Sequence, residues 1–291
     1  MATPYLWYTN FANSTTITNH GSGGAAYNGT ASRNQYGTTS VGHPMWGPMN
    51  GNSDRIAVPG GISNPQSHSW EIGLNISQWW PVDPVVVDGI LCGNDGKLWA
   101  ASNDLFYGYI HEECTYIGGV LTQLGTHYFT VELQGSPGSL DVQFWLGVGN
   151  NKPTKMTPDP IGTDDPGALY QQFGSYELKL NTNYYFQVSV SASGGASGSD
   201  YYIGNCASGC ADASVSGFPC GCYIYCWREF DSVIDFSGGG NWAEDVVLWK
   251  GGTPPTPGPP GPSPGPTPAS NTNLVKVAAS VNVKEYQPRL S

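Results

Sequence analysis

Two carboxylates one residue apart, Glu229 and Asp231, are the chain's nearest approach to a catalytic pair. Side chains two positions apart in a β-strand project from the same face, and hydrolysis of a glycosidic bond uses two carboxyl groups. Carboxylates that alternate with apolar residues are, however, more often the solvated face of a strand. We therefore predict that the protein is not an enzyme, with Glu229 and Asp231 as the catalytic alternative.

Three tryptophans beside prolines are candidates for sugar binding. Trp46 lies between Pro44 and Pro48, and the pair Trp79 and Trp80 precedes Pro81. Proline fixes the local φ angle, and an exposed indole stacks well on a pyranose face. We predict that Trp46, Trp79 and Trp80 bind the ligand. The alternative for each is packing in the core or in a loop.

Acidic residues in loops of Gly, Asn and Pro are weak calcium candidates: Asp95, Asp104, Asp164 and Asp165. Calcium prefers carboxylate and carbonyl oxygens, but none of these residues has a diagnostic spacing. The five histidines are scattered, without the H-x-H or H-E-x-x-H spacing of a metal site. We expect no cofactor, with Ca²⁺ as the one possible ion.

The chain has seven cysteines, and five of them lie between Cys206 and Cys226. The spacings C-x3-C and C-x-C-x3-C do not provide the two separated ligand pairs of a typical zinc cluster. Disulfides that staple Gly-rich loops are the favoured interpretation, with a metal site or inert thiols as alternatives. An odd number leaves at least one thiol free or intermolecular, and the connectivity stays open.

Period-two alternation of apolar and polar residues predicts strands through most of the chain. It is clearest at 70–76, 128–133, 140–146, 184–190, 201–203 and 244–249. Turn residues at 135–138 and 191–199 predict two β-hairpins. No long segment keeps a helical period without Gly or Pro, so we predict an all-β protein with two packed sheets.

The composition excludes several classes of function. Only 11% of the residues are charged, and Gly and Pro number 40 and 23, which disfavours long surface helices. A formal net charge of -11 repels phosphate backbones and anionic lipid, so we expect no nucleic-acid partner. No apolar stretch reaches the roughly 20 residues that span a bilayer, so we expect no membrane insertion. No secretory signal is visible either.

The order of short motifs over residues 1–250 resembles the laminin-G-like branch of the concanavalin A-like lectin/glucanase family. The matching stretches are Asn28-Gly29-Thr30, Asp54 to Pro59, Ser69 to Leu74, Asp95 to Trp99, Thr126 to Val131 with Leu140 to Leu146, and Gly240 to Trp249. The resemblance implies a jelly-roll sandwich, and domains of this branch often hold a calcium ion at the rim of the sandwich. Glycosidases of this fold carry E-x-D-x-x-E, of which Glu229 and Asp231 match only the first half.

Residues 251–268, GGTPPTPGPPGPSPGPTP, have nothing to bury and predict an extended linker. The segment 269–291 follows, with Val275, Val277, Val281 and Val283 on one face of an amphipathic strand. A lone strand exposes unpaired backbone groups. We therefore expect this anchoring segment to add to a partner subunit, with docking on its own sandwich as the alternative.

These observations predict a non-enzymatic binding or adhesion module, with a glycan as its expected ligand, displayed on a Pro-rich stalk. The surface of a virus or phage particle is the favoured context, where the C-terminal segment anchors a decoration or fibre protein, and an extracellular location is the broader expectation. Two alternatives remain open: a secreted polysaccharide-degrading enzyme of the same fold, and a purely structural subunit of an extracellular filament or coat.

Overall fold

The computed structural model describes residues 2–11, 14–49, 54–61, 66–77, 91–101, 106–117, 120–163, 167–176, 178–195, 200–204 and 222–250. All of them belong to one compact unit, Met1–Pro254. The predicted linker 251–268 and anchoring segment 269–291 lie outside the described residues. No helix within the described ranges is long and apolar enough to cross a membrane.

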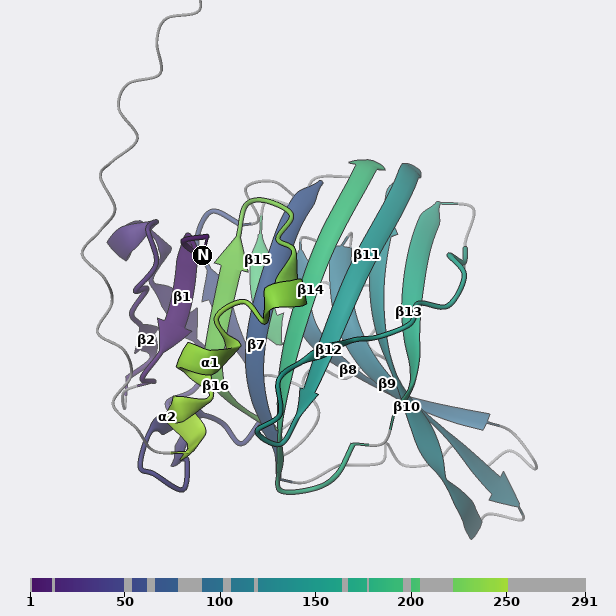
Figure 1. The fold of residues 1–291 in the computed structure, drawn as a ribbon, viewed down its shortest axis with the longest axis horizontal. Helices are drawn as coiled ribbons and strands as arrows, with labels where there is room; N and C mark the ends of the chain where they lie inside the picture. The colour runs from purple at the N-terminus through teal and green to yellow at the C-terminus, as the bar shows by residue number, and fades with distance from the viewer. Residues whose placement is uncertain are drawn as a thin grey trace, which may run out of the picture. The chain divides into compact units, whose positions relative to one another are not determined.

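Two antiparallel sheets face each other in the described part of the chain, with eight strands each (Figure 1). Sheet A has the order β12-β11-β14-β7-β16-β5-β4, with β1 also paired to β16. Its strands are β1 (Leu6–Thr9), β4 (Tyr36–Thr38), β5 (Pro44–Trp46), β7 (Ser67–Ile76), β11 (Pro137–Val148), β12 (Thr154–Lys155), β14 (Thr182–Gly194) and β16 (Cys222–Phe230).

Sheet B has the order β13-β10-β9-β8-β15-β6-β3-β2. Its strands are β2 (Thr16–Ile17), β3 (Gly29–Ala31), β6 (Arg55–Val58), β8 (Leu91–Ala101), β9 (Phe106–Ile117), β10 (Val120–Gln134), β13 (Ala168–Tyr176) and β15 (Tyr201–Gly204). The predicted all-β, two-sheet sandwich is thus confirmed.

Alternating residues of both sheets fill the space between them. In β7, Trp70, Ile72 and Leu74 point inward and are fully buried. The Trp70 ring stacks on Trp99 of β8, with centroids 4.5 Å apart and an interplanar angle of 20°. This contact joins the two sheets near their centre. Burying large aromatic side chains of this kind is the main favourable contribution to folding.

Both hairpins predicted from turn residues are wrong. Strands β10 and β11 follow each other through Gly135 and Ser136, which have φ values of 86° and 57°. Yet β10 pairs with β9 and β13, while β11 pairs with β12 and β14. The second pair, β14 and β15, is also divided between the two sheets. Alternation of apolar and polar residues shows which face of a strand is buried. The pattern is the same whether the next strand pairs beside it in one sheet or packs against it from the other sheet.

The strand predicted at 244–249 is also wrong, because this segment forms two short helices, α1 (Trp242–Asp245) and α2 (Val247–Lys250). In the helices, Asp245 and Leu248 are three positions apart and both are buried. A helical period of 3.6 puts such residues on one face, and that face lies against sheet A. The residue pattern of this segment is therefore compatible with a helix as well as with a strand.

Residues 231–250, here called the C-terminal strap, cover part of the outer face of sheet A. Figure 1 shows α1 and α2 in front of β16 and β7. A 3-10 helix, η3 (Phe236–Gly238), precedes them, and a second one, η1 (Gly24–Tyr27), lies near the N-terminus. The strap makes a third layer over part of the sandwich, which explains why polar residues on the outer face of β7 and β14 are buried.

Candidate functional site

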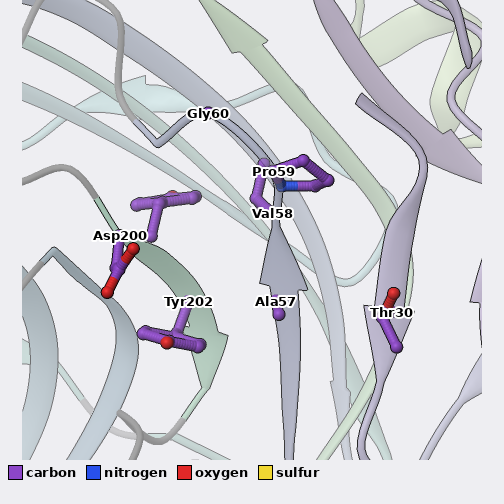
Figure 2. Close-up of a pocket in the computed structure, with 8 residues that line it drawn as sticks. Thr30, Ala57, Val58, Pro59, Gly60, Asp200 and Tyr202 are labelled. Atoms are coloured by element: carbon purple, nitrogen blue, oxygen red, sulfur yellow. The ribbon is translucent and has the colours of Figure 1, made fainter. Parts of the chain in front are cut away.

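A trough on the outer face of sheet B is the candidate site (Figure 2). Three neighbouring strands form its centre, because Thr30 of β3 and Tyr202 of β15 are both register partners of Ala57 in β6. Residues directly opposite in adjacent strands project from the same face. The small Ala57 side chain therefore lies between two longer ones, and the sheet surface is hollow at that position.

The turn after β6 and the residue before β15 close one end of the trough. Pro59 and Gly60 follow β6, and Gly60 has a φ of 78°, which favours glycine. Asp200 immediately precedes β15 and is exposed. The hollow has a volume of about 230 Å³ and is lined by Thr30, Ala57, Val58, Pro59, Gly60, Asp200, Tyr201 and Tyr202. Pockets for drug-sized ligands usually hold about 300 to 1,000 Å³, so this one suits a smaller unit.

Four kinds of group meet at this surface. The Tyr202 ring is half-buried, and the Arg55 guanidinium lies over it, 5.7 Å from the ring centroid. The exposed Thr30 and Asp200 supply a hydroxyl and a carboxylate. An aromatic surface beside a few polar groups is the arrangement that recognises small polyhydroxylated ligands. Because Thr30 and Tyr202 stand on strands, their spacing is set by the sheet.

The candidate catalytic residues lie elsewhere and do not form a pair. Glu229 is in β16, and its side chain points into the core with 0% exposure. It accepts hydrogen bonds from Tyr5 Oη and Trp227 Nε1, both at 2.7 Å, and lies 3.1 Å from His68 Nε2. Asp231 follows the end of the strand and is exposed. The two carboxylates therefore do not face one common cleft.

The surroundings of Glu229 are built to hold its carboxylate in the core. Burial, together with the Glu229 charge, raises the pKa of Tyr5 and of Tyr8 above the usual value of a phenol. Tyr5 therefore keeps its proton and remains a hydrogen-bond donor at any ordinary pH. Buried charges are tolerated only when hydrogen-bonded in this way. The cluster ties the N-terminal segment to β7 and β16.

Trp46, one of the three predicted stacking residues, is buried with 1% exposure. It ends β5, whose register with Ile224 of β16 directs the indole into the core. Its Nε1 donates to the backbone carbonyl of Arg33 at 3.4 Å. This corrects the expectation that the flanking prolines hold the ring outward, and it removes Trp46 from the candidate platforms. Trp79 and Trp80 lie outside the described residues.

The structure leaves the calcium and anchoring predictions open. Asp95 lies in β8 as the register partner of His111. The other three calcium candidates, Asp104, Asp164 and Asp165, lie outside the described residues, as do Val275, Val277, Val281 and Val283. Among the residues that the structure describes, no group of three or more His, Cys, Asp or Glu side chains is placed to hold a metal ion.

The predicted disulfides find no support in the described part of the chain. Cys222 and Cys226 of β16 are free, buried thiols. Burial raises the pKa of both, which keeps them protonated and unreactive. Cys92 of β8 and Cys114 of β9 are register partners. The remaining cysteines, Cys206, Cys210 and Cys220, lie outside the described residues.

A second buried polar cluster holds the strap on sheet A. Arg228 of β16 donates from Nη2 to Asp245 Oδ1 at 2.7 Å and from Nε to Asp245 Oδ2 at 3.0 Å. It also pairs with Glu244 at 3.0 Å. Tyr185 of β14 donates to Asp245 at 2.5 Å. Bidentate pairs of this kind fix orientation as well as charge, so the helix α1 is locked on the sheet.

Glu71 of β7 lies beside this pair under the same strap. It accepts hydrogen bonds from Gln187 Nε2 at 2.8 Å and from the backbone and side chain of Asn241 at 2.8 and 2.6 Å. Burial, and repulsion from Asp245, raise the pKa of Glu71 to about 7, although these hydrogen bonds oppose the shift. The carboxyl group is covered, so its shifted pKa concerns stability and not contact with a ligand.

Comparisons with known proteins were made for the whole chain. No family model matches it, and no curated protein does. One solved structure is similar: domain 4 of a GH43 extracellular arabinanase from Geobacillus stearothermophilus, in complex with arabinotriose. The identity is 11%, the match covers 67% of this chain and 95% of that domain, and the TM-score is 0.27. A likeness at this level carries no argument. The lectin/glucanase family stays a prediction, whereas the two-sheet sandwich follows from the strand pairing itself.

Sequence reasoning missed the residues of the trough. Tyr202 stands in a predicted strand, and its alternation with Tyr201 and Ile203 indicates that it faces away from the core. This alternation could therefore have identified Tyr202 as a residue of the outer face. Its neighbours Thr30 and Ala57 come from segments more than 100 residues away, and only the strand order brings them together.

Proposed function

We propose that this chain is a non-enzymatic glycan-binding module that binds one sugar unit in the trough of sheet B. The observation that carries the proposal is the row Thr30, Ala57 and Tyr202 across three strands, with Asp200 at its end. The Tyr202 ring supplies an apolar face for the sugar, and Thr30 and Asp200 accept hydrogen bonds from its hydroxyls. Rigid strands hold these groups in place before the ligand arrives, which lowers the entropy cost of binding.

The burial of Glu229 favours binding without hydrolysis. A carboxyl group with 0% exposure, already bonded to Tyr5 and Trp227, has no route to a glycosidic bond. General acid catalysis requires hydrogen-bond reach of the leaving oxygen. The burial of Glu229 therefore supports the proposal of a module that binds without catalysis.

The wider setting of the proposal is display on an extracellular particle or surface. The Pro-rich segment 251–268 would present the sandwich, and residues 269–291 would anchor it to a partner subunit. A virus or phage particle remains the favoured context, because low charge, a tether and an amphipathic terminal strand all suit assembly into a larger structure. A structural coat subunit without a ligand is the alternative, and it predicts no glycan binding at all.

Glycan-array screening of the full chain, followed by calorimetry on the best ligand, tests the binding function. Tyr202→Ala is expected to weaken binding by about 1 to 3 kcal/mol, by analogy with stacking on aromatic side chains. Ala57→Phe fills the trough from its floor and is expected to abolish binding. Thr30→Val removes one hydrogen bond and should cost about 0.5 to 1.5 kcal/mol.

A matched control is available on the neighbouring strand. Thr16 of β2 is exposed and is the register partner of Thr30, but it does not line the trough. Thr16→Val should therefore leave binding unchanged. Thermal melting of each variant shows that the fold is intact. Full affinity in Ala57→Phe and Tyr202→Ala would rule out the trough as the sugar site.

A further inference from the structure

The charge of the trough points to the class of sugar that it takes. Asp200 is the one side chain that is charged at neutral pH among the described residues lining it. It is exposed, immediately precedes β15 and lines the same hollow as Tyr202. An exposed carboxylate attracts a cation by its charge and through charge-assisted hydrogen bonds.

Arg55 brings a positive charge to the Tyr202 side of the trough. Arg55 lies over the Tyr202 ring, which shows that this ring already has a cation partner. The Arg55 backbone pairs with Gly204, four residues beyond Asp200, and Arg55 is not among the lining residues. The guanidinium is thus on the Tyr202 side of the trough, and Asp200 is the charged group among the described residues that line it.

The chain as a whole adds to the same preference. Its formal net charge is -11. A field of this sign repels uronic acids and other acidic sugars, and it raises the local concentration of cationic ligands. Both the local carboxylate and the overall charge thus act against anionic glycans.

We propose that the trough selects an amino sugar with a free ammonium group, with that group beside Asp200. The proposal rests on the glycan-binding function proposed above and adds the substrate class. The sugar ring would contact Tyr202, its hydroxyls would meet Thr30, and its ammonium would donate hydrogen bonds to the Asp200 carboxylate. The hollow of about 230 Å³ suits a single residue of this kind.

Calorimetry with glucosamine oligomers, their N-acetylated counterparts and oligogalacturonates tests the proposal on the full chain. Acetylation removes the charge of an amine while the ring stereochemistry stays the same. We expect the parent protein to bind the amino form up to about fivefold more tightly than the acetylated form, from one exposed ion pair. The oligogalacturonates should bind most weakly. The preference should shrink between about 0.01 M and about 1 M salt.

Asp200→Asn should make the amino and acetylated forms bind equally, because it removes the charge and keeps the shape. Asp141 of β11 is an exposed carboxylate on the other sheet. Asp141→Asn makes the same change in net charge and should leave the preference intact. An equal loss of preference in both variants would show non-specific attraction and overturn the proposal.

Three other outcomes would decide the matter. Equal affinity of the parent for amino and acetylated oligomers, or tighter binding of the oligogalacturonates, overturns the amino-sugar assignment but leaves the glycan-binding function standing. Competition by ethanolamine as strong as that by glucosamine assigns the site to simple ammonium ions and also overturns it. Failure of every sugar, charged or neutral, removes the glycan-binding function itself.

Discussion

Replacing Arg228 by methionine tests how the C-terminal strap is held. Arg228 is 3% exposed, and its guanidinium makes three hydrogen bonds to Asp245, whose side chain is 1% exposed. It also lies 4.1 Å from the centroid of the Trp7 ring. Methionine fills similar space but leaves the Asp245 carboxylate buried without its counter-ion.

The magnitude follows from that unpaired charge. Breaking a buried ion pair by removing one partner typically costs about 3 to 5 kcal/mol. Tyr185 would still donate to Asp245, so we expect Arg228→Met to lower the free energy of unfolding by about 3 to 4 kcal/mol. Adding Asp245→Leu should restore most of that loss, because two apolar side chains replace the pair.

Urea denaturation followed by tryptophan fluorescence and circular dichroism measures the effect. Lys155→Met is the matched control, because Lys155 is an exposed cation that lies 5.3 Å from the centroid of the Trp145 ring. It should change stability by no more than about 1 kcal/mol. A loss below about 1 kcal/mol in Arg228→Met, with no recovery in the double variant, would refute a strap held by this pair.

Three further predictions concern single buried side chains. The pKa of Glu71 is raised to about 7 from 4.5. The folded state therefore binds its proton more tightly than the unfolded chain does, and this contribution, up to about 3 kcal/mol, is complete below pH 4.5 and is lost as the pH rises through 7. The unfolding free energy of the parent should thus fall relative to that of Glu71→Gln over this range, and parallel pH profiles would contradict it. Trp46→Ala should cost about 3 to 5 kcal/mol in chemical denaturation, as for a core aromatic, whereas a loop residue would cost far less. Glu229→Gln turns an acceptor into a donor beside Tyr5 and Trp227 and should cost about 1 to 3 kcal/mol; sugar binding by the folded variant should be unchanged, and no hydrolysis of β-glucans should occur in the parent.

The fold class was readable from the sequence because alternation is a local property. Apolar and polar residue types alternate in β7 from Trp70 to Ile76 and in β14 from Phe186 to Ser191, although both faces of these segments are largely buried. The strand predicted at 244–249 was wrong because the same local pattern also fits a helix. Asp245 and Leu248, three positions apart and both buried, lie on one helical face. A short apolar run does not distinguish the two periods, and contact with sheet A selected the helix.

The site was less accessible to sequence reasoning than the fold. Prolines around Trp46 are compatible with an outward indole, yet pairing of β5 with β16 turned the ring inward. Glu229 and Asp231 are two positions apart, but β16 ends between them, at Phe230. In both cases the outcome depended on where a strand ends and which strand lies beside it.

By itself the sequence determined the all-β class and the two-sheet architecture, because burial alternation is a sum over local features. Only the tertiary structure decided which strands pair, and with that the trough. Thr30, Ala57 and Tyr202 belong to β3, β6 and β15, which meet in sheet B after chain connections that include a passage through sheet A. Their hydrogen-bonded register is a long-range property, set when the whole sandwich closes on its core, and no short segment of the chain contains it.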